Sequence, residues 1–353
     1  MRLAACVLLS IAATVELAAI VGAAEPPGQV ERQGGALRMT VGGAPLLEYQ
    51  AAQVEPPAGL LEQIAPGVRK YAVARACYLH PLFGPHDETL TADWNHDHPH
   101  HRGVYWAWPE VQFRGELKDL HALQGISTRA AGEPEIRSGA DFAEIRVQNH
   151  WLWNDKTPIV SERVTIRGQA DGGTGRYVDL TIELTAPTDG VTIARRGTKL
   201  YGGLNIRLAK VQGLTLRHHA DAPADESKPA NRQPRMAWQY ASGVWRGARQ
   251  PATWVVLESA QNPGYPGDYI EYANLPWFQP TFPRAGQRYA LHRGEPLTLR
   301  YRFWIIPGAA PAEDVLRREW TKFHSSSPGR AEGNVPAAAE SSVPTHHPTK
   351  VLP

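Results

Sequence analysis

Histidine is concentrated in one short segment of the sequence. Four of the fourteen histidines fall within the run His96-Asp97-His98-Pro99-His100-His101-Arg102-Gly103. Histidine titrates near neutral pH, transfers protons and binds metals. A loop that concentrates this side chain between proline and glycine is therefore a candidate for acid–base catalysis or for metal binding.

The charged neighbours of these histidines can support such chemistry. Asp97 can accept a hydrogen bond from the N–H group of an imidazole ring and so fix its tautomer. Arg102 offers a cationic fork for a carboxylate or for a developing oxyanion. We expect a catalytic group formed by His98, His100, His101, Asp97 and Arg102, in which His100 or His101 is the acid or base.

Two other interpretations of the segment stay open. A divalent metal could be bound by His96, His98, His100 and His101, although no helical histidine spacing and no cysteine pair supports this, and no cofactor is predicted. The segment could also be a solvated loop without chemistry. Its direct continuation into Tyr105-Trp106-Ala107-Trp108 favours a functional cleft.

One carboxylate lies on the apolar side of a predicted strand. The alternating residues on this side are Val160, Glu162, Val164 and Ile166. Burial raises the pKa of a carboxyl group, which suits a general acid or base near neutral pH. Glu162 is therefore expected to be the partner carboxylate of the histidines, unless it lies at a strand end and reaches water.

Several further side chains are candidates for binding a substrate. One face of a predicted strand carries Lys199, Tyr201, Asn205 and Arg207, which either line a polar cleft or form a solvated face. Eleven tryptophans supply flat apolar surfaces that can stack on sugar rings, although many must belong to the core. The expected substrate-binding residues are His80, Trp106, Trp108, Lys199, Asn205 and Arg207.

The elements that position these residues are mostly strands. Residues 178–184, 204–208 and 297–305 alternate apolar and polar side chains with a period of two. Many short strands separated by Gly, Pro and Asn or Asp turns indicate a sandwich or barrel. The best helical pattern begins at Pro311 and aligns Leu316 with Phe323. We predict an all-β antiparallel sandwich with one short C-terminal helix.

The chain is expected to have three parts. Residues 1–24 have the basic start, apolar run and small final residues of a signal peptide. Residues 25–324 are predicted to form a single β-sandwich domain. Residues 325–353 are rich in Ser, Pro, Ala and Gly and are predicted to form a disordered tail. A periplasmic or secreted location follows, without membrane insertion after signal cleavage.

Charge and cysteine content restrict the partners and the source of stability. The formal net charge of +2 is too small to favour nucleic acid or an anionic membrane. Cleavage at residue 24 would leave only Cys77, so no internal disulfide can form. The domain must be stabilised by its core, and its partner is expected to be a carbohydrate or another small molecule.

Four segments resemble a known family. They are His80-Pro81-Leu82-Phe83-Gly84-Pro85, Asp97-His98-Pro99-His100-His101-Arg102-Gly103, Gly202-Gly203-Leu204-Asn205-Ile206-Arg207 and Asn262-Pro263. Together they resemble exported bacterial proteins catalogued as methane oxygenase PmoA-type, a domain of unknown function common in polysaccharide degraders. The resemblance extends from Leu37 to Phe323. It differs at Tyr201, where an acidic residue is expected.

This resemblance implies a galactose mutarotase-like supersandwich, in which two large antiparallel sheets leave a cleft on one concave face. It does not imply a methane monooxygenase membrane subunit, which would need several apolar spans of about twenty residues. The sequence predicts an exported carbohydrate-active enzyme, a hydrolase or lyase more than an epimerase. The alternatives are a non-catalytic glycan-binding protein and a histidine-ligated metalloprotein, which would include the oxygenase label.

Overall fold

The computed structural model describes residues 27–219, 231–232, 238–272 and 275–325. The predicted signal peptide, residues 1–24, lies outside these ranges. The predicted tail, residues 325–353, also lies outside them except for Ser325, which is the last residue of the C-terminal helix. The domain boundaries proposed from the sequence therefore stay predictions.

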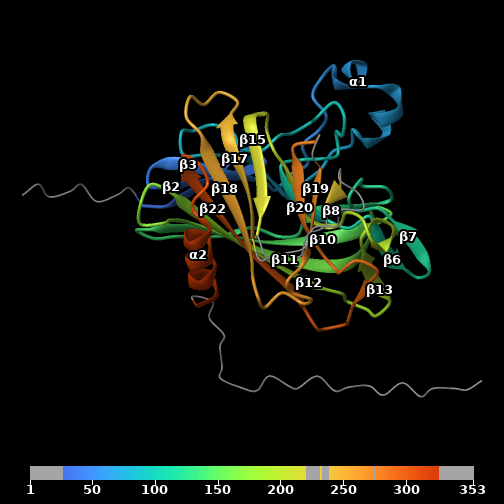
Figure 1. Ribbon diagram of the computed structural model, residues 1–353. Helices are drawn as coiled ribbons and strands as arrows, with labels where there is room; N and C mark the ends of the chain where they lie inside the picture. Colours follow the sequence, from blue (N-terminus) through green and yellow to red (C-terminus); the bar gives the residue numbers. More distant parts are fainter. Residues whose placement is uncertain (1–26, 220–230, 233–237, 273–274, 326–353) are drawn as a thin grey trace, which may run out of the picture.

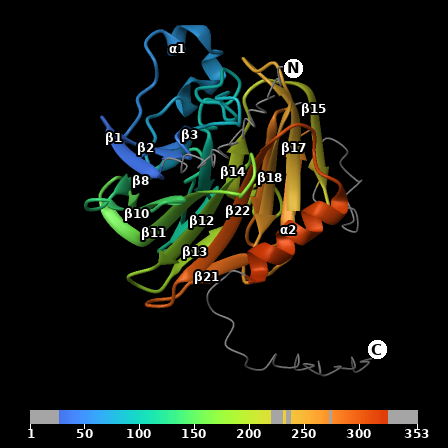
Figure 2. The same ribbon diagram turned by 90° about the vertical axis from the view of Figure 1, so that its left-hand side faces the viewer.

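Two large antiparallel sheets form the body of the protein (Figures 1 and 2). The first sheet has the strand order β1 (Gln29–Gln33), β2 (Ala36–Val41), β3 (Ala44–Gln50), β4 (Tyr78–Leu82), β5 (Val104–Ala107), β14 (Gly203–Arg207), β20 (Trp277–Thr281), β19 (Asp268–Tyr272) and β16 (Asn231–Arg232). The second sheet has the order β15 (Val211–His218), β17 (Trp238–Trp245), β18 (Ala252–Glu258), β22 (Leu297–Pro307), β12 (Arg176–Thr185), β11 (Thr157–Ala170), β10 (Phe142–Trp153) and β8 (Ile126–Ala130), and β9 (Glu135–Ser138) also pairs with β10.

A third, smaller sheet and four short helical segments complete the fold. The small sheet has the order β21 (Arg288–Leu291), β13 (Val191–Ala194), β6 (Glu110–Phe113) and β7 (Glu116–Lys118). The helical segments are α1 (Leu60–Gln63), the 3-10 helices η1 (Pro66–Tyr71) and η2 (Arg196–Thr198), and α2 (Glu313–Ser325).

The main core lies between the two large sheets. Alternation along each strand sends every second side chain into this space. Trp254 of β18 meets Phe278 of β20 with ring centroids 6.1 Å apart. Trp108, just after β5, meets Trp151 of β10 at 5.5 Å. Large apolar rings from both sheets therefore interdigitate, and their burial stabilises the sandwich by removing apolar surface from water.

Helix α2 covers the outer face of the second sheet (Figure 2). Its first turn carries Glu313 and Asp314, which favour a helix N-terminus. Leu316 and Phe323 are buried and pack in a cluster with Trp304. The helix explains why β22 is buried on both faces in its second half.

The predicted fold class is confirmed, because the protein is an antiparallel β sandwich with a C-terminal helix. The one-turn helix α1 and the small third sheet were not expected. None of the helices in the described residues is long and apolar enough to cross a bilayer.

The Asn262-Pro263 segment has a structural role at the end of β18. Asn262 exchanges hydrogen bonds with the backbone of Arg300, donating over 3.0 Å and accepting over 2.7 Å. The loop that it fixes encloses Glu258, whose Oε2 accepts a hydrogen bond of 2.9 Å from the Gly267 backbone. Burial raises the pKa of the Glu258 carboxyl group to about 8. The folded protein therefore keeps this carboxyl group protonated near neutral pH.

We expect the free energy of unfolding to fall as the pH rises from about 4.5 to about 8. In this window the folded state holds a proton on Glu258 that the unfolded chain has released, and the effect is at most about 5 kcal/mol. Glu258→Gln should remove this part of the pH dependence. Denaturant unfolding of both proteins across this range measures it, and parallel pH profiles would contradict the assignment.

Candidate active site

The histidine segment lies on the outer face of the first sheet, on the side opposite the main core. Leu204, Ile206 and Phe278 point into the core. Side chains next to these residues along each strand point to the opposite face. They include Asn205 of β14, between Leu204 and Ile206, and Trp277 of β20, directly before Phe278. Tyr105 is paired with Asn205 in the sheet register and so shares its face. This outer face carries polar and aromatic side chains that the loops then bury.

Arg102 anchors the histidine segment to the sheet. Its guanidinium forms a bidentate ion pair with Asp93, in which Nη2 lies 3.0 Å from Oδ2, and Nη2 also donates to the Tyr78 hydroxyl over 2.5 Å. The guanidinium also lies 3.5 Å from the centroid of the Trp94 ring. The side chain is fully buried. The loop is therefore held by a buried ion pair. Removing either partner would leave the other charge buried and unpaired.

Two further contacts hold the loop. Arg207 of β14 donates from Nη2 to both carboxylate oxygens of Asp97 at 3.0 Å each. Gly103 has a φ of 54° in the left-handed region, and a Cβ there would lie 2.1 Å from the carbonyl oxygen of Leu79. No residue with a side chain fits this position without displacing the backbone of β4.

A third histidine reaches the same place from another loop. His121 follows β7, in a turn where the Ala122 backbone donates to Asp119 Oδ1 over 2.9 Å. The Arg75 guanidinium donates to the His121 carbonyl oxygen over 2.5 Å. His121 Nε2 lies 3.0 Å from the Tyr105 hydroxyl and 3.0 Å from Asn205 Oδ1. The ring is thus held from behind by the outward residues of β5 and β14.

His100, His101 and His121 form one cluster of imidazoles. The ring centroids of His100 and His101 are 4.6 Å apart, and His121 lies 5.2 Å from the first and 5.3 Å from the second. One ring nitrogen of each can be chosen so that all three lie within 4.8 Å of one another. All three side chains are buried.

These three imidazoles are uncharged at neutral pH. Burial and the nearby Arg75 guanidinium lower the pKa of His100 to about 3. Burial and neighbouring imidazoles hold the pKa of His101 and that of His121 well below the ordinary value. A neutral imidazole keeps one nitrogen lone pair, so each ring can accept a proton or bind a cation.

The cluster forms part of the wall of a cavity with a volume of about 320 Å³. The residues lining it are Tyr71, His98, His100, His101, Asp119, His121, Ala122, Arg196, Tyr201, Tyr272, Leu275 and Trp277. Trp277 stacks on Tyr272 with ring centroids 4.6 Å apart and lies 4.7 Å from His101. Asp119 and Arg196 form an ion pair at its edge. Polar groups and flat aromatic faces therefore converge on this cavity.

Glu162 does not belong to this cavity, which corrects its expected pairing with the histidines. It faces the core as the strand pattern predicted and is 1% exposed. Its carboxylate accepts hydrogen bonds from Asn149 over 2.7 Å and from Trp151 over 2.8 Å. Burial raises the pKa of Glu162. Its environment is a polar pocket within the sandwich, separated from the outward face by the first sheet.

None of the six expected substrate-binding residues lines the cavity, and three of them have structural contacts elsewhere. Trp106 and Trp108 are core residues, and the Trp108 Nε1 donates to the Phe282 carbonyl oxygen over 2.7 Å. His80 is bonded through Nδ1 to the Thr91 hydroxyl at 2.9 Å. Arg102, expected to stabilise negative charge on a substrate, instead balances Asp93. These four side chains support the site structurally.

The remaining expected residues are divided between the cavity and its surroundings. His98 lines the cavity, half-exposed, and stacks on His101 at 4.7 Å. His96 and Lys199 are exposed, and Lys199 follows η2 outside any strand, which corrects its placement on the strand of Asn205. Asn205 and Arg207 are buried behind the cavity, where they contact His121 and Asp97.

Sequence reasoning missed His121, Asp119 and Arg196. Tyr201, which the sequence pattern placed on a face that could line a cleft, does line the cavity. The three missed residues lie far from the histidine run in sequence, and only Arg196 has a neighbour of its own kind, Arg195. Asp119 and His121 flank Leu120 in an unremarkable turn sequence. The sheet register sets Tyr105 beside Asn205, and Arg75 donates to the His121 carbonyl oxygen; together these contacts bring the turn to the histidine loop.

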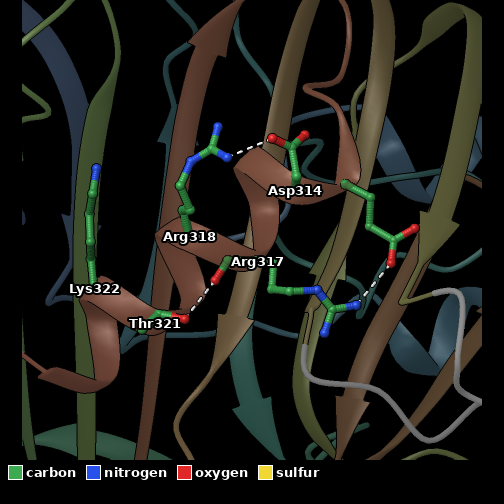
Figure 3. Close-up of a pocket in the computed structure, with 6 residues that line it drawn as sticks. Asp314, Arg317, Arg318, Thr321 and Lys322 are labelled. Carbon is green, nitrogen blue, oxygen red and sulfur yellow. Dashed lines mark hydrogen bonds and ion pairs between the residues drawn. The ribbon is translucent and has the colours of Figure 1, made fainter.

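A second hollow lies on the exposed side of α2 (Figure 3). It is lined by Glu313, Asp314, Arg317, Arg318, Thr321 and Lys322. Arg318 pairs with Asp314 at 2.6 Å and Arg317 with Glu313 at 3.2 Å, each four residues apart on the helix. This arrangement is typical of a solvated helix face. It lacks the enclosure of the histidine cavity.

The fold and the cavity define an antiparallel β-sandwich protein with a buried three-histidine cluster on the outer face of one sheet. Residues 36–321 match a family described as "Family of unknown function (DUF6807)". The chain belongs to this family. The family description gives no activity, so the resemblance to PmoA-type proteins stays a prediction. Comparison with curated proteins gives no match.

Solved structures with a distant likeness include several carbohydrate-active enzymes. A GH36 α-galactosidase from Geobacillus stearothermophilus has a TM-score of 0.36 at 9% identity, over 79% of this chain and 39% of that one. A galactose 1-epimerase from Lactobacillus acidophilus NCFM has a TM-score of 0.35 at 9% identity, over 79% of this chain and 93% of that one. A galactose mutarotase related enzyme from Lactobacillus acidophilus has a TM-score of 0.34 at 7% identity, over 80% and 97%. This chain spans about two fifths of the α-galactosidase, and TM-scores this low carry no argument about the reaction.

We expect Arg102→Met to destabilise the fold by about 3–5 kcal/mol, because it leaves the Asp93 carboxylate unbalanced beside a buried hydroxyl. Asp93→Asn combined with Arg102→Met should recover part of this loss, since neither charge then remains. Arg318→Met removes an exposed pair and should cost less than about 1 kcal/mol. Denaturant unfolding measures all three. Equal effects of Arg102→Met and Arg318→Met would contradict the role of the clamp.

Proposed function

We propose that this protein is an exported carbohydrate-active enzyme, a hydrolase or lyase, whose active site is the cavity of His100, His101 and His121. The observation that carries the proposal is the convergence of three buried, uncharged imidazoles on one cavity that is partly open to solvent. The export of the enzyme is proposed from the signal-peptide pattern of residues 1–24.

The position of the cluster supports catalysis more than a structural role. Core histidines are ordinarily satisfied by hydrogen bonds. Here the Nδ1 atoms of His100 and His101 are buried and have no hydrogen-bond partner among the described residues. Leaving such groups unsatisfied costs free energy. A site that keeps unsatisfied groups at a cavity is ready for a ligand that supplies the missing interactions.

The lining supports a sugar as the substrate. Trp277 and Tyr272 form a stacked aromatic pair beside His101, and Tyr71 contacts His100 with ring centroids 4.9 Å apart. Aromatic rings offer apolar faces, and Asp119 and Arg196 add groups that accept and donate hydrogen bonds. A volume near the lower end of ligand pockets suits a short part of a glycan.

The neutral state of the histidines supports two kinds of chemistry. An unprotonated ring nitrogen can remove a proton from a carbon, a hydroxyl group or an attacking water. The same lone pair can bind a metal ion. Arg196 lies at the cavity edge and can bind an acidic group of a substrate, so a glycan with a carboxylate is a suitable candidate.

We expect His100→Ala to lower turnover of a susceptible polysaccharide by a factor of about 10²–10⁴, as loss of an acid–base or metal-binding group does. His292→Ala, which changes an exposed histidine between β21 and β22, should leave turnover unchanged. The assay is a screen of plant and algal polysaccharides that detects both new reducing ends and unsaturated products. Circular dichroism confirms that each variant is folded.

Two results would contradict the proposed function. Equal turnover by the wild type and His100→Ala would remove this cavity from the reaction. Saturable binding of a glycan without any product would favour a non-catalytic glycan-binding protein.

A further inference from the structure

We propose that His100, His101 and His121 bind one divalent transition-metal ion, with Zn²⁺ as the best match, and that Asn205 positions His121 for this purpose. The inference deepens the proposed function, because it identifies a cofactor for the same cavity and rests on that cavity being the active site. It replaces the ligand set expected from sequence, since His96 is exposed and His98 lies at the cavity rim.

The distances suit one ion shared by three imidazoles. One nitrogen from each ring lies within 4.8 Å of the other two. Nitrogen atoms bound to one tetrahedral zinc ion lie about 3.4 Å apart, since each Zn–N bond is about 2.0–2.1 Å. To share one ion, the nitrogens that lie up to 4.8 Å apart must approach one another by at most about 1.4 Å. Three histidines with one open coordination position are the ligand set of many catalytic zinc sites.

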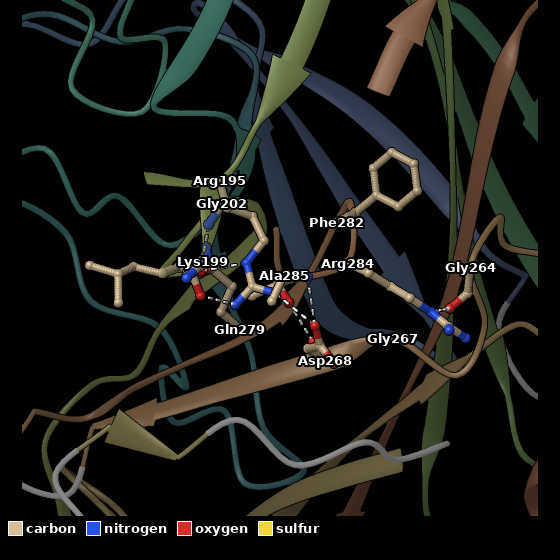
Figure 4. A network of polar contacts seen from close by, with 12 residues as sticks. Arg195, Lys199, Gly202, Gly264, Gly267, Asp268, Gln279, Phe282, Arg284 and Ala285 are labelled. Atoms are coloured by element: carbon tan, nitrogen blue, oxygen red, sulfur yellow. Dashed lines mark hydrogen bonds and ion pairs between the residues drawn. The ribbon is translucent and has the colours of Figure 1, made fainter. Parts of the chain in front are cut away.

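Hydrogen bonds define which nitrogen of His121 carries its proton. The Gly202 backbone donates to Gln279 Oε1 over 3.0 Å (Figure 4). The Gln279 amide nitrogen is therefore the group that donates to Asn205 Oδ1. The Asn205 Nδ2 donates to the Gly203 carbonyl oxygen over 2.8 Å. Asn205 Oδ1 is therefore an acceptor, and His121 Nε2, 3.0 Å away, must donate to it.

This assignment leaves Nδ1 of His121 with its lone pair. Metal-binding histidines commonly donate from the other ring nitrogen to a fixed acceptor, which sets both the tautomer and the orientation of the ring. Asn205 is such an acceptor, and it is completely buried. The ion pair between Arg195 and Asp268, at 2.8 Å, lies beside Gln279 and Gly202 in the same network (Figure 4). The proton position of His121 thus follows from the fold.

His100 and His101 supply the other two ligands. Each has a buried Nδ1 atom without a hydrogen-bond partner among the described residues. No hydrogen bond within the described part of the chain fixes either ring, so both can turn toward an ion. The nearby cations Arg75 and Arg196 oppose a positive ion, and Asp119, paired with Arg196 at the cavity edge, offsets part of this charge. Ligand bonds to three lone pairs must outweigh the remaining repulsion.

Metal analysis of the mature protein, expressed without a histidine tag, tests the site directly. We expect about one Zn²⁺ per chain after dialysis against trace zinc. The apoprotein should gain thermal stability when Zn²⁺ is added, since an ion that binds only the folded state stabilises it. Cobalt substitution should give the visible absorption of a tetrahedral site. Zinc below about one tenth per chain, together with an unchanged melting temperature, would overturn the proposal.

Single substitutions separate the ligands from their surroundings. His121→Ala should abolish stoichiometric binding, and Asn205→Ala should weaken Zn²⁺ binding by about 10–100-fold while keeping three ligands. His96→Ala removes an exposed histidine from the same loop and should bind Zn²⁺ as the wild type does. Equal affinity of the His121→Ala, Asn205→Ala and wild-type proteins would overturn the assignment even if zinc is present.

The outcomes distinguish the metal site from the proposed function. Stoichiometric Zn²⁺ in a protein that converts no polysaccharide would contradict the enzyme proposal and leave the metal site standing. Full turnover by chelator-treated protein with no residual metal would contradict the metal site and leave the enzyme proposal standing.

Discussion

Three imidazole rings can share one buried cavity only while they are uncharged, and this constraint governs the architecture around them. His100, His101 and His121 lie too close together for two protons to be added without strong repulsion. Burial and the Arg75 guanidinium suppress the first protonation as well. The protein therefore keeps these nitrogen lone pairs unprotonated at neutral pH, so that they remain available to a metal ion. The loops that bury the rings are what keep them neutral.

Those loops depend on the histidine-rich segment having two kinds of residue. Arg102 and Gly103 hold the backbone, the first through Asp93 and the second through its close approach to β4. Asp97 ties the tip of the loop to Arg207. His100 and His101 are thereby presented to the cavity by a rigid loop. In the histidine-rich segment, most residues therefore hold the loop, and His100 and His101 face the cavity. The Asn262-Pro263 segment after β18 also has a structural role.

Period-two patterns predicted the sandwich and its C-terminal helix because alternation and helical stripes are local properties of the chain. Strand alternation also predicted that Glu162 faces the core, but it could not predict the hydrogen-bond donors to its carboxylate. The rule gives the face of a side chain and not what lies opposite it, which proved to be Asn149 and Trp151. His121 was out of reach for a different reason. Its meeting with His100 depends on sheet register and on a turn held by Arg75, and neither leaves a pattern in the sequence near His121.

The central claim is that the three imidazoles act together on one ligand, a metal ion. The most direct measurement is a crystal structure of the untagged mature protein grown with zinc, with anomalous data collected above and below the zinc edge. The account predicts one strong anomalous peak bound by His100, His101 and Nδ1 of His121, with the Nε2 atom of His121 still donating to Asn205. A structure in which the cluster has no anomalous peak, while zinc binds elsewhere on the surface, would contradict it.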